Sequence, residues 1–176
     1  MSTTEKLKGT QTETNLQVAF AGESQARNRY TYFAEVARTD GNDEVAKFFE
    51  HCANHEKAHA RAWYKLLNDG LSDTKTNLLS AIEGEHYEHT NMYPSFAKIA
   101  REEGFEDIAV SFEDVARVEA RHEAQCKAVL RDYDKYLYKY PDTLCLDCGH
   151  EFIESNKNEK CPICGASSAF FMQITE

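Results

Sequence analysis

Four segments of helical periodicity, each with a glutamate on its apolar face, constrain the fold of this chain most strongly. The segments are expected over residues 12–38, 43–67, 74–103 and 105–140, and turn sequences such as "DGND" and "NDG" separate them. Four amphipathic helices with short connections predict an all-α, antiparallel four-helix bundle. Pro94 lies inside the third segment, where we expect a bend or a local opening of the helix.

The acidic residues on these apolar faces recur at matched positions, together with two histidines. The set comprises Glu23, Glu56, His59, Glu85, Glu88, Glu119 and His122. An unpaired buried carboxylate is costly, so five converging carboxylates beside two imidazoles predict metal ions. Two Glu-x-x-His pairs, each with one further Glu at a matched offset, predict two related helix pairs around a two-metal site. Glu88 breaks this symmetry, because Ala26 occupies the matching position in the first half.

The stretch "HEKAH" at residues 55–59 also fits the H-E-x-x-H pattern of zinc proteases. In that interpretation His55 and His59 bind zinc and Glu56 activates water. It leaves the acidic residues of the other three helices unused, and it places His55 at the edge of the apolar stripe. The two-metal carboxylate site is therefore the favoured hypothesis, with Glu56 and His59 as ligands.

The chain changes character after Pro141. Residues 142–176 contain two C-x-x-C pairs, "CLDCG" and "CPICG", in a tail too small to fold on an apolar core alone. A glycine follows each second cysteine, where a positive φ lets backbone N–H groups turn towards sulfur. The pattern predicts a tetrahedral metal site. Its ligands are Cys145, Cys148, Cys161 and Cys164.

Composition limits the classes of binding partner and the cellular compartment that we expect for this protein. The net charge of −10 argues against nucleic acid or an anionic membrane as a partner. We expect no export signal at the N-terminus and no membrane span, and therefore a cytoplasmic, reducing location. Ligand identity alone leaves iron and manganese open in the bundle, and zinc and iron open in the cysteine site.

The ordered set of motifs resembles the rubrerythrin family, in which a ferritin-like di-iron domain precedes a rubredoxin-like domain. The motifs are "AFAGESQARNRY" (19–30), "HEKAH" (55–59), "GEHYEHTNMYPSFAKIAREEG" (84–104), "EARH" (119–122) and the two cysteine pairs. The resemblance implies a ferritin-like bundle over residues 1–140 and a small rubredoxin-like β/loop domain over residues 141–176. It also implies two oxo- and carboxylate-bridged non-haem irons in the bundle and one Fe(Cys)4 iron in the tail.

The resemblance also implies a role for each site residue. Glu56 and Glu119 would bridge the irons, Glu85 and His122 would serve one iron, and Glu23 with either Glu88 or His59 would serve the other. Ferric iron should prefer the carboxylate of Glu88 and ferrous iron the imidazole of His59. Tyr30 and Tyr93 match tyrosines that hydrogen-bond ligand carboxylates and so fix their geometry.

Two functions follow from these expectations. The first is a peroxidase that reduces hydrogen peroxide to water in oxidative-stress defence, with electrons from NAD(P)H arriving through a rubredoxin or a separate reductase. The alternative is a ferritin-like ferroxidase that stores iron. Storage has no evident need for a thiolate redox centre, so residues 142–176 favour the enzyme.

The length of the last helix leads to a prediction about assembly. If that helix runs unbroken from Glu119 to Tyr140, it extends about 30 Å at 1.5 Å per residue. The cysteine site would then begin too far from the di-iron site of its own chain for rapid electron transfer, unless the tail folds back along the bundle. We therefore expect a head-to-tail homodimer or larger oligomer, in which electrons pass between chains.

Overall fold

The computed structural model describes residues 2–133, 143–152 and 160–174 of the 176-residue chain. The chain divides into two compact units, Met1–Ser72 and Asp73–Glu176. The boundary expected between residues 140 and 141 lies outside the described residues. Within the described residues, no helix combines the length and apolar character needed to cross a bilayer.

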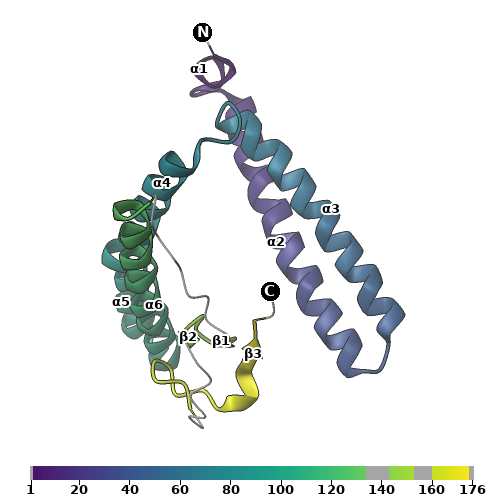
Figure 1. Ribbon diagram of the computed structural model, residues 1–176, viewed down its shortest axis with the longest axis vertical. Helices are drawn as coiled ribbons and strands as arrows, with labels where there is room; N and C mark the ends of the chain where they lie inside the picture. Colours follow the sequence, from purple (N-terminus) through teal and green to yellow (C-terminus); the bar gives the residue numbers. More distant parts are fainter. Residues whose placement is uncertain (1, 134–142, 153–159, 175–176) are drawn as a thin grey trace. The chain divides into compact units, whose positions relative to one another are not determined.

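The first unit is an antiparallel helical hairpin that follows a short helix. Helices α1 (Thr3–Leu7), α2 (Gln11–Thr39) and α3 (Asp43–Leu67) form it, and α2 and α3 run side by side (Figure 1). Three buried alanines, Ala34, Ala37 and Ala46, pack with Phe49 at one end of the hairpin. Their small side chains let the two backbones approach closely where the chain turns.

The second unit begins with a continuous helical segment that is α-helical at both ends and π-helical in the middle. Helix α4 (Thr74–Tyr87) passes into the π-helical segment η1 (Glu88–Met92) and then into α5 (Tyr93–Glu102). The backbone N–H of Tyr93 donates to the carbonyl of Glu88, five residues back, as a π-helical bond requires. Pro94 has no N–H to donate and its ring crowds the preceding turn. The predicted local opening at Pro94 is thus confirmed.

Helix α6 (Glu106–Arg131) packs against α4 and α5 within the second unit. Ala97, Ala100 and Ala109 are buried together against Phe112, which repeats the alanine packing of the first unit. Gly104, at φ +87°, makes the turn between α5 and α6. The alanines again keep two helices close at a turn.

The prediction that the last helix continues towards Tyr140 is wrong. Helix α6 ends at Arg131, and Asp132 leaves the helical region with φ −108° and ψ 30°. An acidic residue at a helix C-terminus is unfavourable because the macrodipole places negative charge there. The tyrosine-rich sequence that follows also has weaker helical propensity than the preceding turns. Residues 134–140 themselves lie outside the described residues.

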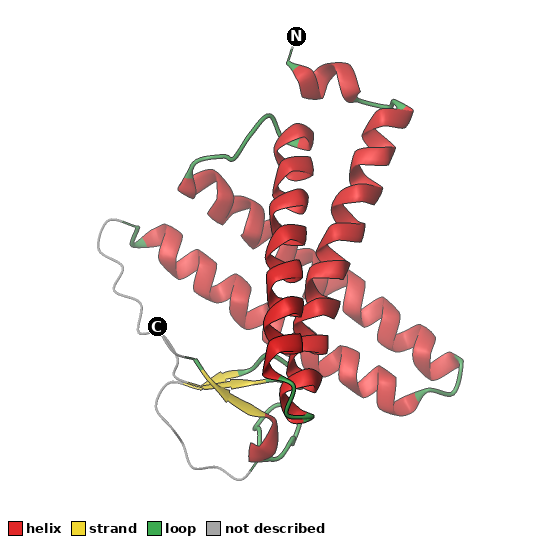
Figure 2. Cartoon of the chain, turned by 90° about the vertical axis from the view of Figure 1, so that its right-hand side faces the viewer, coloured by secondary structure: helices red, strands yellow, loops and turns green. Residues whose placement is uncertain are grey.

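A small sheet carries the cysteine pairs. Strands β1 (Thr143–Cys145), β2 (Glu151–Phe152) and β3 (Phe171–Gln173) pair antiparallel in the order β2-β1-β3, with the 3-10 turn η2 (Ser168–Phe170) before β3 (Figure 2). Val118 of α6 is buried in one cluster with Cys145, which ends β1, and with Cys148 and Cys161 of the cysteine turns. The cysteine turns therefore lie against α6 of their own chain, which is the folded-back arrangement that the sequence left open.

Candidate metal centres

The four cysteines of the tail converge on one point. Cys145 Sγ lies 3.7 Å from Cys164 Sγ, and Cys148 Sγ lies 3.7 Å from Cys161 Sγ. Sulfurs at about 2.3 Å from a tetrahedral metal would be about 3.8 Å apart. The sulfur positions thus fit a single four-coordinate ion without rearrangement.

The backbone around the sulfurs is built as two matching turns. Gly149 and Gly165 have φ of +75° and +76°, as predicted. Their N–H groups donate to the carbonyls of Cys145 at 2.8 Å and Cys161 at 2.9 Å. Burial raises the pKa of the Cys148 thiol, so a bound cation is needed to hold this sulfur as thiolate at neutral pH.

One acidic group lies between α2 and α3 in the first unit. His59 Nδ1 is 2.9 Å from Glu56 Oε2 and 3.8 Å from Glu23 Oε1. One ligand atom from each residue lies within 4.8 Å of the others. Hydrogen bonds with Glu23 and His59 hold the pKa of Glu56 below its ordinary value. The carboxylate of Glu56 is thus favoured in its charged form, the form that binds a cation.

A second acidic group of the same composition lies between α4 and α6. His122 Nδ1 is 2.7 Å from Glu119 Oε2 and 3.7 Å from Glu85 Oε2, nearly the distances of the first group. The pKa of Glu85 is raised, first by burial and then by its hydrogen bond with Glu119. Two carboxylates and one imidazole suit iron, manganese or zinc.

Glu88 and Tyr93 flank the second group. Glu88 opens η1, and burial together with the charge of Glu85 raises the pKa of Glu88. Burial, followed by the charges of Glu88 and Glu119, raises the pKa of Tyr93. The phenol therefore stays protonated and can donate to a carboxylate. Its counterpart Tyr30 packs on aromatic rings of the first unit instead.

The geometry of residues 55–59 separates the two interpretations of "HEKAH". Glu56 and His59 face Glu23, whereas His55 stacks on His51 with ring centroids 4.2 Å apart. His55 thus belongs to another face of α3 than His59. This arrangement does not fit a zinc site that uses both histidines.

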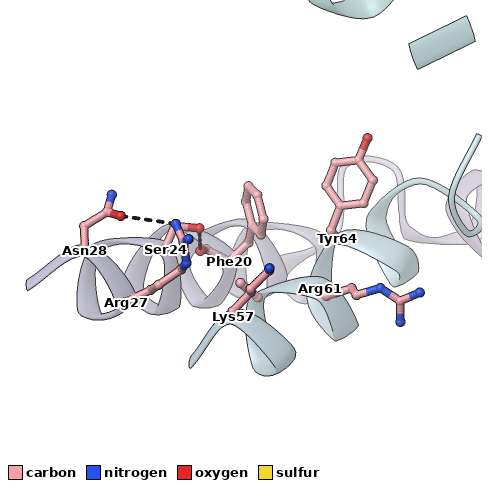
Figure 3. A pocket seen from close by; sticks show the side chains of 8 residues that line it. Phe20, Ser24, Arg27, Asn28, Lys57, Arg61 and Tyr64 are labelled. Atoms are coloured by element: carbon pink, nitrogen blue, oxygen red, sulfur yellow. Dashed lines mark hydrogen bonds between the residues drawn. The ribbon is translucent and has the colours of Figure 1, made fainter. Parts of the chain in front are cut away.

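An open pocket of about 340 Å³ lies next to the first group but does not include its ligands. Figure 3 shows Arg27 and Asn28 of α2 and Lys57 and Arg61 of α3 around it, with Phe20 and Tyr64 along its apolar part. Ser24 is not available as a donor to a ligand there, because its hydroxyl donates to the Phe20 carbonyl at 2.8 Å. The pocket adds no ligand to the metal centre.

One cluster is not among the predicted sites. His86, His89 and Glu123 form a third group of ligand atoms within 4.8 Å of one another. From the sequence alone, the two histidines are expected to be surface residues or residues that support the ligands, and Glu123 has no predicted role. A signal is nevertheless present in the sequence, since His86 and His89 are spaced by one helical turn and Glu123 follows Glu119 by four residues.

Comparison with known proteins finds similar sequences in one family. A sequence model of the rubrerythrin family matches residues 14–130. Rubrerythrin-1 of Clostridium acetobutylicum is 37% identical over 190 residues, covering 97% of each chain. Rubrerythrin of Nitratidesulfovibrio vulgaris is 39% identical over 181 residues, covering 94% of this chain and 95% of that one. A solved structure titled "Partially Reduced State of Nigerythrin" is 33% identical, covers 93% of this chain and 86% of that one, and has a TM-score of 0.48.

Fold, ligand groups and sequence likeness define a ferritin-like di-iron protein with a C-terminal rubredoxin-like domain. The chain belongs to the rubrerythrin family. The predicted fold class is confirmed, and so are the predicted cofactors, namely two non-haem irons and one iron bound by four cysteines. As a member of this family the protein is an oxidoreductase.

Proposed function

We propose that this protein is a peroxidase that reduces hydrogen peroxide to water in oxidative-stress defence, with electrons entering through the four-cysteine site. One observation carries the proposal. The cysteine domain packs on Val118, the residue next to Glu119 on α6, so the two redox sites share one helix within one unit. A ferroxidase that only stores iron would have no use for this contact.

The contact between the cysteine domain and α6 has polar as well as apolar parts. Arg121 Nη1 donates to His150 Nδ1 at 2.6 Å, and Arg117 Nη2 lies 3.4 Å from the carbonyl of Ile163. Burial, followed by the charge of Arg121, lowers the pKa of His150, which keeps its ring neutral and able to accept. These contacts hold the first cysteine turn at Arg121 and the second at Arg117, and His150 lines a small pocket together with His122. They support the proposal that electrons reach the bundle irons from the cysteine site of the same chain.

We propose that the two acidic groups together hold the two irons. The ligands are Glu23, Glu56, His59, Glu85, Glu88, Glu119 and His122. When bound, the two ferrous ions supply the two electrons that cleave the O–O bond of hydrogen peroxide. The overall reaction consumes one peroxide, two electrons and two protons and yields two waters. Glu56 and Glu119 are proposed as bridging carboxylates.

Side chains near the two groups are proposed to orient the ligand carboxylates and to provide alternative iron ligands. Tyr93 stays protonated, so it orients a carboxylate by donating a hydrogen bond. Tyr30 is proposed to do the same for the first group. Glu88 and His59 are proposed as alternative ligands for one iron in its oxidised and reduced states. The π-helical segment supports this role for Glu88, because such segments interrupt regular helices and recur at functional sites.

We also propose how the protein is supplied with electrons and where it acts. A rubredoxin or an NAD(P)H-dependent reductase would reduce the four-cysteine iron, and the cytoplasm would provide both. A homodimer or larger oligomer stays a prediction. Helix α6 ends at Arg131, so the helix length from which we predicted that assembly does not support it.

Anaerobic addition of peroxide to the fully reduced protein tests the function. We expect both iron sites to be reoxidised stoichiometrically, with one peroxide consumed for each two electrons. Visible spectra would follow the Fe(Cys)4 site, and peroxide would be assayed directly. Growth of a ferric mineral while the Fe(Cys)4 site stays reduced would instead support storage and contradict the proposal.

A further inference from the structure

We propose that His86, His89 and Glu123 form a third metal site, which binds a divalent ion of the zinc type separately from the irons. Two imidazoles and one carboxylate form a ligand set typical of such ions. The three residues come from α4, η1 and α6 respectively. The site is therefore built within the second unit.

The distances support binding of one ion by all three side chains. His86 Nδ1 is 3.1 Å from Glu123 Oε1, and His89 Nε2 is 2.7 Å from Glu123 Oε2. The two imidazole rings are 5.4 Å apart and nearly perpendicular, at 89°. Nitrogen and oxygen ligands at about 2.0–2.1 Å from tetrahedral zinc are about 3.3 Å apart. One ligand atom from each of the three residues already lies within 4.8 Å of the others, so the three can converge on one ion.

Burial and exposure at the cluster also suit a binding site. Glu123 is only 8% exposed and His89 is largely covered, whereas the side chain of His86 is 59% exposed. The carboxylate is thus held in place on the inner side, while the exposed imidazole leaves a path for an ion and room for a water ligand. Catalytic and exchangeable zinc sites typically have three protein ligands and one open position.

Lys127 competes with a metal ion for the carboxylate of this cluster. Its Nζ lies 2.5 Å from Glu123 Oε1 and supplies a positive charge to the carboxylate. The lysine side chain is 58% exposed, so it can move into solvent when a divalent ion takes its place. A divalent ion can also contact both histidines. The lysine ammonium cannot, because it only donates hydrogen bonds and a protonated ring nitrogen cannot accept one.

An ion at this cluster would have a structural consequence for the neighbouring site. It would link η1, which carries Glu88, to α6, which carries Glu119 and His122. The three proposed zinc ligands are nevertheless distinct from those three residues. Zinc binding can therefore be measured without peroxide turnover, and its failure would leave the peroxidase proposal untouched.

The test adds Zn²⁺ to the full-length protein already loaded with iron. We expect one zinc per chain to be retained after desalting with no loss of iron, as measured by mass spectrometry of the metals. Crystals of this protein should show an anomalous peak at the zinc edge between His86, His89 and Glu123. Absence of that peak at saturating zinc, or uptake only in exchange for iron, would overturn the proposal.

Variants assign the zinc to these side chains. Glu123→Gln keeps the shape of the side chain and removes its charge, and His86→Asn with His89→Asn removes both imidazoles. Each should weaken zinc binding by more than the roughly 10–100-fold lost when a supporting residue is removed. Zinc retention by Glu123→Gln at wild-type affinity would overturn the assignment even if the double variant does not fold.

The matched control is a second pair of histidines. His51 and His55 stack at 4.2 Å on α3 but are not part of a described three-ligand group. Replacing both with Asn should leave the additional zinc bound. Circular dichroism of all variants would verify that helix content is unchanged. Loss of zinc in this control alone would place the ion on α3 and contradict the proposal.

Discussion

The two acidic groups have the same ligands and nearly the same distances, but different surroundings. The group on α2 and α3 lies on a regular hairpin, and the side chain of its His59 is 56% exposed. The group on α4 and α6 adjoins a π-helical segment and the cysteine domain, and His122 is 35% exposed. Matched spacing in a sequence thus does not produce equivalent chemical environments.

Electrostatics shows the same contrast. Hydrogen bonds lower the pKa of Glu56 in the first group, whereas burial raises the pKa of Glu85 and Glu88 in the second. Glu88, the fifth carboxylate, flanks the second group. We infer that the first group serves mainly as a ligand set, while the second also determines ligand exchange and electron entry. Variants of the two groups can test that division.

The largest loss of peroxide turnover is expected from removing the proposed bridging glutamate of either group, a role in which the two groups should be equivalent. Glu56→Ala and Glu119→Ala each remove a proposed bridging ligand, so each should lower peroxide turnover by at least about 100-fold, beyond the loss seen for supporting residues. Iron analysis should show loss of bundle iron in both variants. Glu50→Ala, which removes a partly exposed ion pair between Glu50 of α3 and Arg38 of α2, is the control and should keep full activity. Retained iron in either ligand variant would contradict the shared role.

Mixed oligomers test whether electron entry belongs to the second unit of one chain. Chains carrying Cys145→Ser and Cys161→Ser would be combined with chains carrying Glu56→Ala and Glu119→Ala. Because the cysteine domain packs on α6 of its own chain, neither chain then has both an intact cysteine site and an intact α6 ligand set. We expect no recovery of activity.

Recovery in verified mixed oligomers would show that electrons pass between chains. That result would restore the head-to-tail arrangement expected from the sequence. A mixture of the wild type with either variant is the control for exchange of chains during mixing. Activity should be measured with peroxide and a chemical reductant of the cysteine site.

The two tyrosines should differ in a way that follows from their surroundings. Tyr93→Phe removes a hydroxyl near three acidic side chains, and we expect about a 10-fold loss of turnover, at the lower end for a residue that orients a ligand. Tyr30→Phe should have a smaller effect, because Tyr30 packs mainly on Phe33 and Phe49. Both variants should keep their iron. Equal losses of turnover in the two variants would show that both groups depend on their tyrosines to the same extent.

Many features of the fold could be predicted from the sequence, because the relevant signals are local. Helix α3 begins at Asp43 and ends at Leu67, as the periodicity and turn signals predicted. Gly149 and Gly165 have the predicted positive φ, since the turn after each cysteine pair requires it. Pro94 likewise marks the opening of the helix.

What the sequence did not predict depends on contacts between distant segments. The packing of Val118 on the cysteine turns joins residues that are far apart in the chain, and the helical periodicity of the sequence does not predict it. The end of α6 at Arg131 was missed because apolar residues continue the pattern beyond it. Glu123 was overlooked because its partners lie on α4 and η1.

The smallest effect concerns how the ligand-bearing helices of the two units begin. The Thr10 hydroxyl caps α2 by accepting from the N–H of Glu13 at 3.1 Å. The Asp73 carboxylate caps α4, accepting from the N–H of Thr76 at 3.1 Å and from its hydroxyl at 2.7 Å. Thr10→Ala should cost about 1 kcal/mol of unfolding free energy, as for other caps. Asp73→Ala should also lower the melting temperature at neutral pH.

Only the second of these effects should depend on pH. Hydrogen bonds from the Thr76 hydroxyl and then its N–H hold the pKa of Asp73 below its ordinary value. A carboxyl with a lowered folded-state pKa contributes stability that is fully present above the unfolded value and is lost as pH falls through the folded value. The difference in melting temperature between wild type and Asp73→Ala should therefore shrink below pH 3.8, while the Thr10→Ala difference stays constant. Because each variant is compared with wild type at the same pH, acid effects shared by both proteins cancel. A constant difference for Asp73→Ala would show that the cap acts without its charge.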